Sequence, residues 1–336
     1  QADHGQGGDV SAETTRDAAQ LHTPVLVDQC MDLLAPALTR PDSLLIDATL
    51  GMGGHTHAAL TRFPHIRVVG IDRDPQAIAL ASERLREFGQ RFEAVKTTYD
   101  QIGQVIDDHS ADGLADAVLM DLGVSSLQLD ETERGFSYAH DAPLDMRMDP
   151  TRGRSAAELI ADASVQELTD ILRTFGQERF AHRIATLIVN ERAEQPITRT
   201  GQLADLVKRA IPAPARRTGG NPSKRTFQAL RIAVNNELDI LRAAIPQALS
   251  HLRVGGRMVV EAYQSLEDRI VKEIFAQGAR DNAPPGLPVV PESMKATLTL
   301  VTRGALQADS AEQESNPRSR SVRVRAVEIR SPWRPQ

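Results

Sequence analysis

Glycines and carboxylates follow two apolar segments early in the chain. Residues 44–46 are apolar and lead to Asp47, and residues 68–71 lead in the same way to Asp72. The loop after Asp47 carries three glycines, Gly51, Gly53 and Gly54. A strand, a glycine-rich turn, a helix and a second strand that ends in an acid are typical of the nucleoside-binding half of an α/β sheet. We expect the backbone of the loop to approach a nucleoside and the Asp72 carboxylate to accept hydrogen bonds from its ribose.

A structural interpretation of this segment stays open, because glycines also suit a tight turn with positive φ and Asp72 would then be a surface acid. The spacing of the glycines also departs from the strict dinucleotide-binding pattern. Asp121 is a sharper candidate. It ends another short strand-like segment, residues 116–121, and an acid at that place has few structural reasons to be there.

Cysteine and histidine give no sign of metal or disulfide chemistry. The single cysteine, Cys30, lies in an apolar helical stretch and is expected to be buried. The nine histidines are scattered, and His55 and His57 would point to different sides of a helix. The sequence therefore predicts no zinc site.

The net charge is −6, but the chain contains two basic regions. Residues 199–231 contain a single acid, Asp205, and eight basic residues: Arg199, Lys208, Arg209, Arg216, Arg217, Lys224, Arg225 and Arg231. The tail from Asn316 has six arginines against Glu328. This distribution indicates a localised contact with a polyanion, with a merely solvated surface as the alternative.

Strands and helices alternate as far as Asp121. We expect strands at residues 43–48, 67–72, 92–97 and 116–121, in a parallel sheet with right-handed crossovers. From there to residue 235 only helical patterns occur, and the sheet resumes at 257–261. Residues 296–302 and 321–329 have no helix between them and should form an antiparallel pair. The pattern favours a seven-stranded methyltransferase sheet over a six-stranded dehydrogenase sheet.

These elements predict a domain organisation. We expect a disordered segment (1–21), a sheet domain (22–127 and 235–336) and a helical insertion domain (128–234). There is no apolar run of membrane-spanning length and no signal-peptide pattern in residues 1–20. A lone cysteine fits a reducing compartment, so we expect a cytoplasmic protein without a membrane partner.

Short motifs in a fixed order are more specific than any of these features. They are His22–Leu26, Gly51–His55, Ile71–Pro75, Met120–Ser126, Arg134–Ser137, Pro143–Met148, Arg225–Arg231, Ser265–Arg269 and Asn316–Arg318. The set resembles the MraW family of bacterial ribosomal RNA cytosine-N4 methyltransferases over about residues 22–330. One departure is Tyr263-Gln264, where the family commonly has Phe-His, so Gln264 cannot act there as an acid or base.

The resemblance implies a Rossmann-like, seven-stranded class I methyltransferase sheet with a helical insertion that recognises RNA. It implies N4-methylation of a cytidine in 16S ribosomal RNA, with S-adenosylmethionine as cofactor. The cofactor contacts would be Gly53, Gly54, His55, Asp72, Tyr99, Asp121 and Gln128. Taken alone, Tyr99 could equally be a core aromatic residue and Gln128 a loop amide. The partner would be the free RNA or the assembled small subunit, and a homodimer is compatible with the family.

The chemistry of methyl transfer to a cytosine amine points to an acceptor that holds the amine hydrogens. Asp121, or a carbonyl group of residues 121–125, is the candidate catalytic group. The base must leave its stack to reach the pocket, and Phe136 and Tyr138 could stack on it, although core packing is as well supported for Phe136. The remaining substrate-binding candidates are Asp145, Arg147, Lys224 and Arg225. An internal Asp145–Arg147 ion pair is an equal alternative.

Two other classes of function remain. A nicotinamide-linked oxidoreductase is disfavoured by the final antiparallel pair and by the lack of a recognisable catalytic Lys, Tyr or His arrangement. A non-catalytic RNA-binding or ribosome assembly factor could keep the same fold, but the intact glycines and Asp72 speak against it. Measurement of cofactor binding would separate it from an enzyme.

Overall fold

The computed structural model describes residues 24–216 and 220–334. The predicted disordered segment, the first two residues of the first motif and Arg217 of the basic region lie outside the described residues. None of the described helices is both long and apolar enough to cross a membrane.

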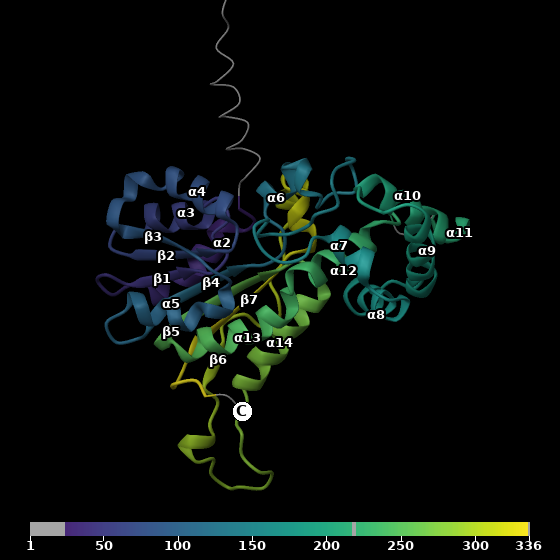
Figure 1. Ribbon diagram of the computed structural model, residues 1–336. Helices are drawn as coiled ribbons and strands as arrows, with labels where there is room; N and C mark the ends of the chain where they lie inside the picture. Colours follow the sequence, from purple (N-terminus) through teal and green to yellow (C-terminus); the bar gives the residue numbers. More distant parts are fainter. Residues whose placement is uncertain (1–23, 217–219, 335–336) are drawn as a thin grey trace, which may run out of the picture.

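A seven-stranded sheet forms the centre of the molecule (Figure 1), with the strand order β3-β2-β1-β4-β5-β7-β6. The strands are β1 (Leu44–Asp47), β2 (Arg67–Asp72), β3 (Phe92–Lys96), β4 (Ala115–Asp121), β5 (Leu252–Ala262), β6 (Leu298–Leu300) and β7 (Arg323–Ile329). The first five strands are parallel, and β7 runs antiparallel to both β5 and β6. The predicted seven-stranded, Rossmann-like α/β fold with its final antiparallel pair is confirmed.

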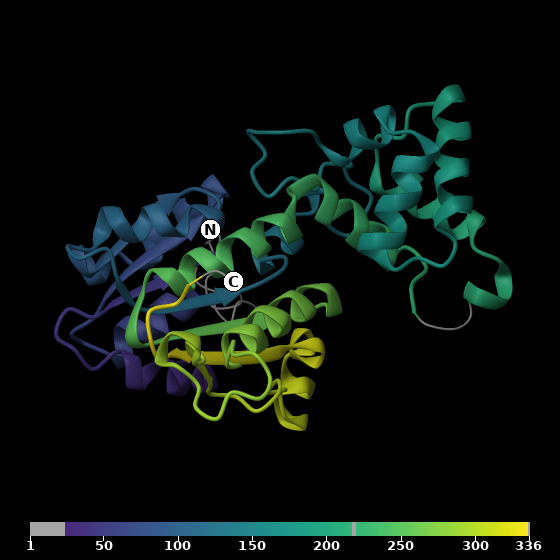
Figure 2. The ribbon, with the colours of Figure 1, turned by 90° about the horizontal axis from the view of Figure 1, so that it is seen from below.

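Two layers of helices cover the two faces of this sheet (Figure 2). One layer contains α2 (Val27–Leu34), α3 (Gly54–Arg62) and α4 (Pro75–Arg84), and the other contains α5 (Ile102–His109), α13 (Glu237–Ser250) and α14 (Ser265–Gly278). The alternation of side chains along a strand supplies both cores. In β1, Leu45 packs into the first core, whereas Leu44 and Ile46 pack into the second.

Helices follow β4 and lie to one side of the sheet, where they share a core of their own. They are α6 (Ser126–Asp130), α7 (Ala156–Asp162), α8 (Val165–Gly176), α9 (Ala181–Glu194), α10 (Thr200–Ala210), α11 (Ala213–Arg216) and α12 (Lys224–Asn235). Ser155 and Ser164 cap α7 and α8, because their hydroxyls accept hydrogen bonds from backbone N–H groups of the first turns. No strand occurs among the described residues between β4 and β5. The division into a sheet domain and an RNA-recognising insertion domain remains a proposal.

One strand, β5, begins earlier than expected, and one helix, α12, was not expected. β5 begins at Leu252 rather than at residue 257, so Gly255 and Gly256 lie inside the strand. A side chain at Gly256 would lie 2.8 Å from the carbonyl oxygen of Asp116, which explains the glycine at this close approach. Helix α12 has no counterpart in the predicted elements, because its N-terminal charges read as a basic surface.

Candidate functional site

A pocket lies at the carboxyl ends of the central strands, where open α/β sheets bind their ligands. Its walls come from the loops after β1, β2, β3 and β4, from the end of β5 and from the segment before β7. Asn316 and Arg318 belong to that last segment. The Arg318 guanidinium donates hydrogen bonds to Val124 O and Ser126 Oγ, both at 2.6 Å, and so holds the loop after β4.

Six of the seven predicted cofactor contacts line this pocket: Gly54, His55, Asp72, Tyr99, Asp121 and Gln128. Gly53 does not. It precedes α3 with a φ of 82°, and a side chain there would lie 2.9 Å from Leu85. The structure therefore gives Gly53 a role in the turn and in helix packing, since its position favours glycine and leaves no room for a side chain.

Asp72 ends β2 and organises the glycine loop. Its carboxylate accepts hydrogen bonds from the backbone N–H groups of Gly51, at 2.8 Å, and Asp74, at 2.9 Å. Burial raises the pKa of Asp72 to about 6, although these two bonds act in the opposite direction. A carboxylate in this setting keeps free lone pairs toward the pocket and can accept the hydroxyls of a ribose.

Gln128 has structural partners in addition to its place in the pocket wall. Its side chain and that of Ser125 form a reciprocal cap at the start of α6. Its Nε2 also lies 3.4 Å from Oδ2 of the buried Asp74, which is paired in turn with Arg134. This network connects the loop after β4 to the loop after β2.

Asp121 ends β4 with an unused acceptor. Its backbone N–H donates to Thr49 Oγ1 at 2.6 Å, which fixes the end of the strand. Oδ2 lies 3.9 Å from Nδ1 of His55, while Oδ1 is buried and has no hydrogen-bond partner among the described residues. The Asp121 side chain lines the pocket and is 28% exposed, so its carboxylate can accept a hydrogen bond from a ligand there.

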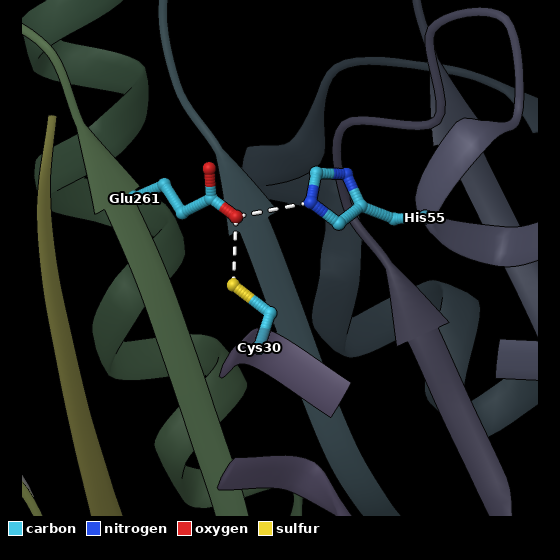
Figure 3. A group of neighbouring side chains, drawn as sticks. All are labelled: Cys30, His55 and Glu261. Carbon is cyan, nitrogen blue, oxygen red and sulfur yellow. Dashed lines mark hydrogen bonds and ion pairs between the residues drawn. The ribbon is translucent and has the colours of Figure 1, made fainter. Parts of the chain in front are cut away.

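Behind Asp121 lies a buried cluster of Cys30, His55 and Glu261, which come from α2, α3 and β5 (Figure 3). The Cys30 thiol donates to Glu261 Oε1 at 2.7 Å, and His55 Nε2 lies 3.0 Å from the same oxygen. Tyr263 donates its hydroxyl to Glu261 Oε2 at 3.1 Å and also lines the pocket. Every oxygen of Glu261 is thus satisfied.

The charges of this cluster depend on one another. Burial disfavours a charged His55, but the Glu261 carboxylate outweighs it and raises the pKa of His55 to about 10, so the ring is protonated at neutral pH. Burial, together with the charge of Glu261, raises the pKa of Asp121 to about 7. Burial and Glu261 also raise the pKa of Cys30, which stays a thiol.

Three residues at this site were not among those predicted from the sequence: Glu261, Tyr263 and Arg318. A signal existed for Glu261, because β5 carries an acid near its carboxyl end as β1, β2 and β4 do. Gln264 does not line the pocket, and neither polar atom of its amide has a partner among the described residues.

The predicted stacking residues are not at the pocket. Phe136 is buried in the core of the helical region, beneath the Arg134 guanidinium, which lies 5.9 Å from its ring. Because its ring is covered by protein, the proposed stacking of Phe136 on a base is not supported. Tyr138 packs edge-on against Phe227 at 5.6 Å in the same region.

The predicted RNA contacts are likewise not among the pocket-lining residues. Arg147 forms a bidentate ion pair with Asp145, at 2.7 and 3.1 Å. This is the internal ion pair that was the alternative to an RNA contact. Lys224 and Arg225 begin α12 and are exposed, and Arg225 donates to Gln177 O at 2.8 Å. An RNA contact at these four residues remains a prediction.

Comparison with known proteins gives one consistent finding. The model of the MraW methylase family matches residues 19–330. A ribosomal RNA small subunit methyltransferase H of Beutenbergia cavernae is 58% identical over 310 residues, which cover 92% of this chain and 93% of that protein. The protein of the same name from Mycolicibacterium smegmatis is 56% identical over 330 residues, covering 96% and 88%.

Proposed function

The chain belongs to the MraW methylase family, and we propose that it transfers a methyl group from S-adenosylmethionine to N4 of a cytidine in small-subunit ribosomal RNA. The observation that carries the proposal is the carboxylate of Asp121, at the end of β4, in the wall of a nucleoside-type pocket. A ribosomal substrate would place this reaction in the cytoplasm.

The residues of the pocket fit the cofactor. Asp72 offers a carboxylate for the ribose hydroxyls, Tyr99 offers an aromatic ring, and the backbone of Gly54 is open to the pocket. When bound, S-adenosylmethionine supplies the methyl group, whose carbon forms a bond to the amine nitrogen as its bond to sulfur breaks and the electron pair stays on sulfur.

Asp121 would orient the amine. The nitrogen lone pair of cytosine is conjugated with the ring and is a poor nucleophile. An acceptor that holds an amine hydrogen turns the lone pair toward the methyl carbon and stabilises the positive charge that develops on nitrogen. The Asp121 carboxylate is accessible from the pocket for this contact, and the bond from the Asp121 N–H to Thr49 fixes the backbone beside it.

The RNA would contact the protein in two places, the pocket and the start of α12. The target base must leave its stack to reach Asp121. Lys224 and Arg225 are exposed cations at the start of α12 and would contact phosphates. The pocket would thus bind the amine that is methylated, and the basic end of α12 would bind the phosphates of the RNA.

The direct test uses the purified chain, S-adenosylmethionine with a labelled methyl group, and small-subunit RNA from cells that lack the enzyme. One arm contains protein-free RNA and the other assembled small subunits. We expect label at N4 of one cytidine in at least one arm, and a loss of about 10²–10³ in single-turnover rate for Asp121→Asn. Cofactor binding without label in either arm would instead support a non-catalytic RNA-binding protein.

A further inference from the structure

Glu261 is a fully buried carboxylate to which the proposed reaction assigns no task. It is the register partner of Asp121 on the neighbouring parallel strand. The two side chains therefore leave the sheet side by side on the same face. Two negative charges at such a distance repel each other unless protons or a cation offset them, so this pairing needs an explanation.

His55 and Tyr263 connect the two carboxylates. The His55 ring has one nitrogen 3.0 Å from Glu261 and the other 3.9 Å from Asp121. The Tyr263 hydroxyl donates to Glu261 at 3.1 Å and also lowers the pKa of Asp121, so it acts on both acids. Glu261 is fully buried and both of its carboxylate oxygens accept hydrogen bonds, whereas the Asp121 side chain lines the pocket and is 28% exposed.

We propose that Asp121 and Glu261 act as a carboxylate pair, in which Asp121 receives the proton that the methylated amine must lose and Glu261 keeps Asp121 able to receive it. This inference rests on the proposed function. In the step, a nitrogen–hydrogen bond breaks, its electron pair returns to nitrogen, and the proton joins the Asp121 carboxylate. Glu261 does not touch the substrate and is a positioning residue.

The charged groups around Asp121 support this division of roles. After burial, the Glu261 charge is the largest influence that raises the pKa of Asp121, while His55 and Arg318 lower it. Asp47 acts on the His55 ring, whose pKa it raises. With a pKa of about 7, Asp121 is partly a carboxylate at neutral pH and basic enough to take a proton in the reaction.

A metal ion at Cys30, His55 and Glu261 is the competing explanation, since their ligand atoms all lie within 4.8 Å of one another. A tetrahedral zinc ion with bonds of 2.0–2.3 Å separates its ligands by about 3.3–3.8 Å. Here sulfur and nitrogen lie 2.7 and 3.0 Å from the same Glu261 oxygen, and both distances are shorter than the ligand separation of such a zinc site. The geometry favours shared protons, and the zinc content of the protein decides between the two.

The experiment compares Glu261→Gln and Tyr263→Phe with the wild type and with Asp47→Asn, which removes a buried acid next to His55 but outside the pair. The first readout is the pH dependence of single-turnover methyl transfer at saturating S-adenosylmethionine. The second is the titration of the Asp121 carboxyl carbon by NMR in the cofactor-free protein, assigned with Asp121→Asn.

We expect the wild-type rate to rise with pH through about 7 as Asp121 loses its proton. In Glu261→Gln the midpoint departs from that of the wild type, because Asp121 loses a like charge and His55 loses the carboxylate that keeps its ring protonated. The plateau falls about tenfold, because the basicity of Asp121 is no longer matched to the proton transfer. In Tyr263→Phe the midpoint moves to higher pH, since the carboxylate loses a stabilising hydroxyl. Asp47→Asn keeps the plateau rate within about twofold.

Equal midpoints in the wild type and both variants would overturn the inference, as would one zinc ion per chain that is lost in Glu261→Gln. A failure of the proposed function looks different, because the wild type would then transfer no methyl group. The NMR titration still tests the pair in that case, since it needs neither RNA nor cofactor. Tyr263→Phe keeps the aromatic ring, so it still tests the carboxylate pair if the Glu261→Gln variant does not fold.

Discussion

The two acids that face the pocket from β2 and β4 differ in how the fold uses their oxygens. Asp72 accepts two backbone N–H groups and so shapes the glycine loop as well as facing the ligand. Asp121 has one oxygen near His55 and one with no partner. The first residue is thus suited to hold a ligand in place, and the second to act on a group that arrives with a hydrogen to donate.

For Asp72, we predict that Asp72→Asn weakens S-adenosylmethionine binding by about 10–150-fold, because charged hydrogen bonds to the ribose are lost. Wild-type binding should also weaken as the pH falls below about 6, where the carboxylate takes up a proton. Isothermal titration calorimetry measures both effects. Asp107→Asn, on helix α5, serves as the control. If a folded Asp72→Asn variant bound S-adenosylmethionine within twofold of the wild-type affinity, the role of Asp72 at the ribose would be contradicted.

For Asp121, we predict that Asp121→Asn is more stable than the wild type at pH 8, by a few degrees in melting temperature. Folding raises the pKa of Asp121 from its usual 3.8 to about 7, so the charged form is disfavoured in the folded state. This penalty is complete above pH 7 and declines as the pH falls from 7 toward 3.8. The advantage of the variant should therefore shrink between pH 8 and pH 5.5.

Calorimetric melting at the two pH values checks this prediction. Asp112→Asn is the matched control, because Asp112 forms an ion pair with Arg253 that lowers the pKa of Asp112. That substitution should not raise the melting temperature at either pH. A wild type that is more stable than Asp121→Asn at pH 8 would show that Asp121 is a structural residue.

At the scale of elements, apolar strands that end in acids were predictable because their signals are local. The end of β4 at Asp121 is an example. The pair of Asp121 and Glu261 was not predictable, because it depends on the register between β4 and β5. These strands are separated in sequence by the whole helical region, and periodicity carries no register across such a distance.

Helix α12 was missed for a different reason. Its first residues, Lys224 and Arg225, are charged and exposed, whereas the apolar face that packs on the helical core begins only at Phe227. The same charges now form an exposed basic end on an ordered helix. An ordered cationic surface of this kind suits a phosphate backbone better than a flexible loop does.

We predict that the double variant Lys224→Gln/Arg225→Gln binds RNA more weakly and with a flatter salt dependence. Each lost phosphate contact should reduce the log–log slope by about 0.7–0.9, so the total change is about 1.4–1.8. Fluorescence anisotropy with an RNA fragment at several salt concentrations measures the slope. Arg242→Gln/Lys272→Gln, on α13 and α14, is the matched control and should keep the wild-type slope. An unchanged slope in the α12 variant would show that Lys224 and Arg225 are solvated surface residues that do not contact the RNA.

The whole molecule combines an acidic pocket at the edge of the sheet with a separate helical core on one side. Composition and motif order were sufficient to predict the fold and the location of most pocket residues. The positions of Phe136 and Gly53 were not predictable, because a motif shows which residues recur together and not which of them packing covers. Phe136 serves the helical core, and Gly53 serves the turn before α3.

The proposed reaction, methylation of a cytidine at N4 in small-subunit ribosomal RNA, can be tested in cells. Mass spectrometry of nucleosides from that RNA is the measurement, in a strain without the gene and in the same strain complemented with the wild type or with Asp121→Asn. We predict that N4-methylated cytidine falls in the deletion strain, returns with the wild type and stays low with Asp121→Asn. An unchanged content of N4-methylated cytidine in the deletion strain would contradict it.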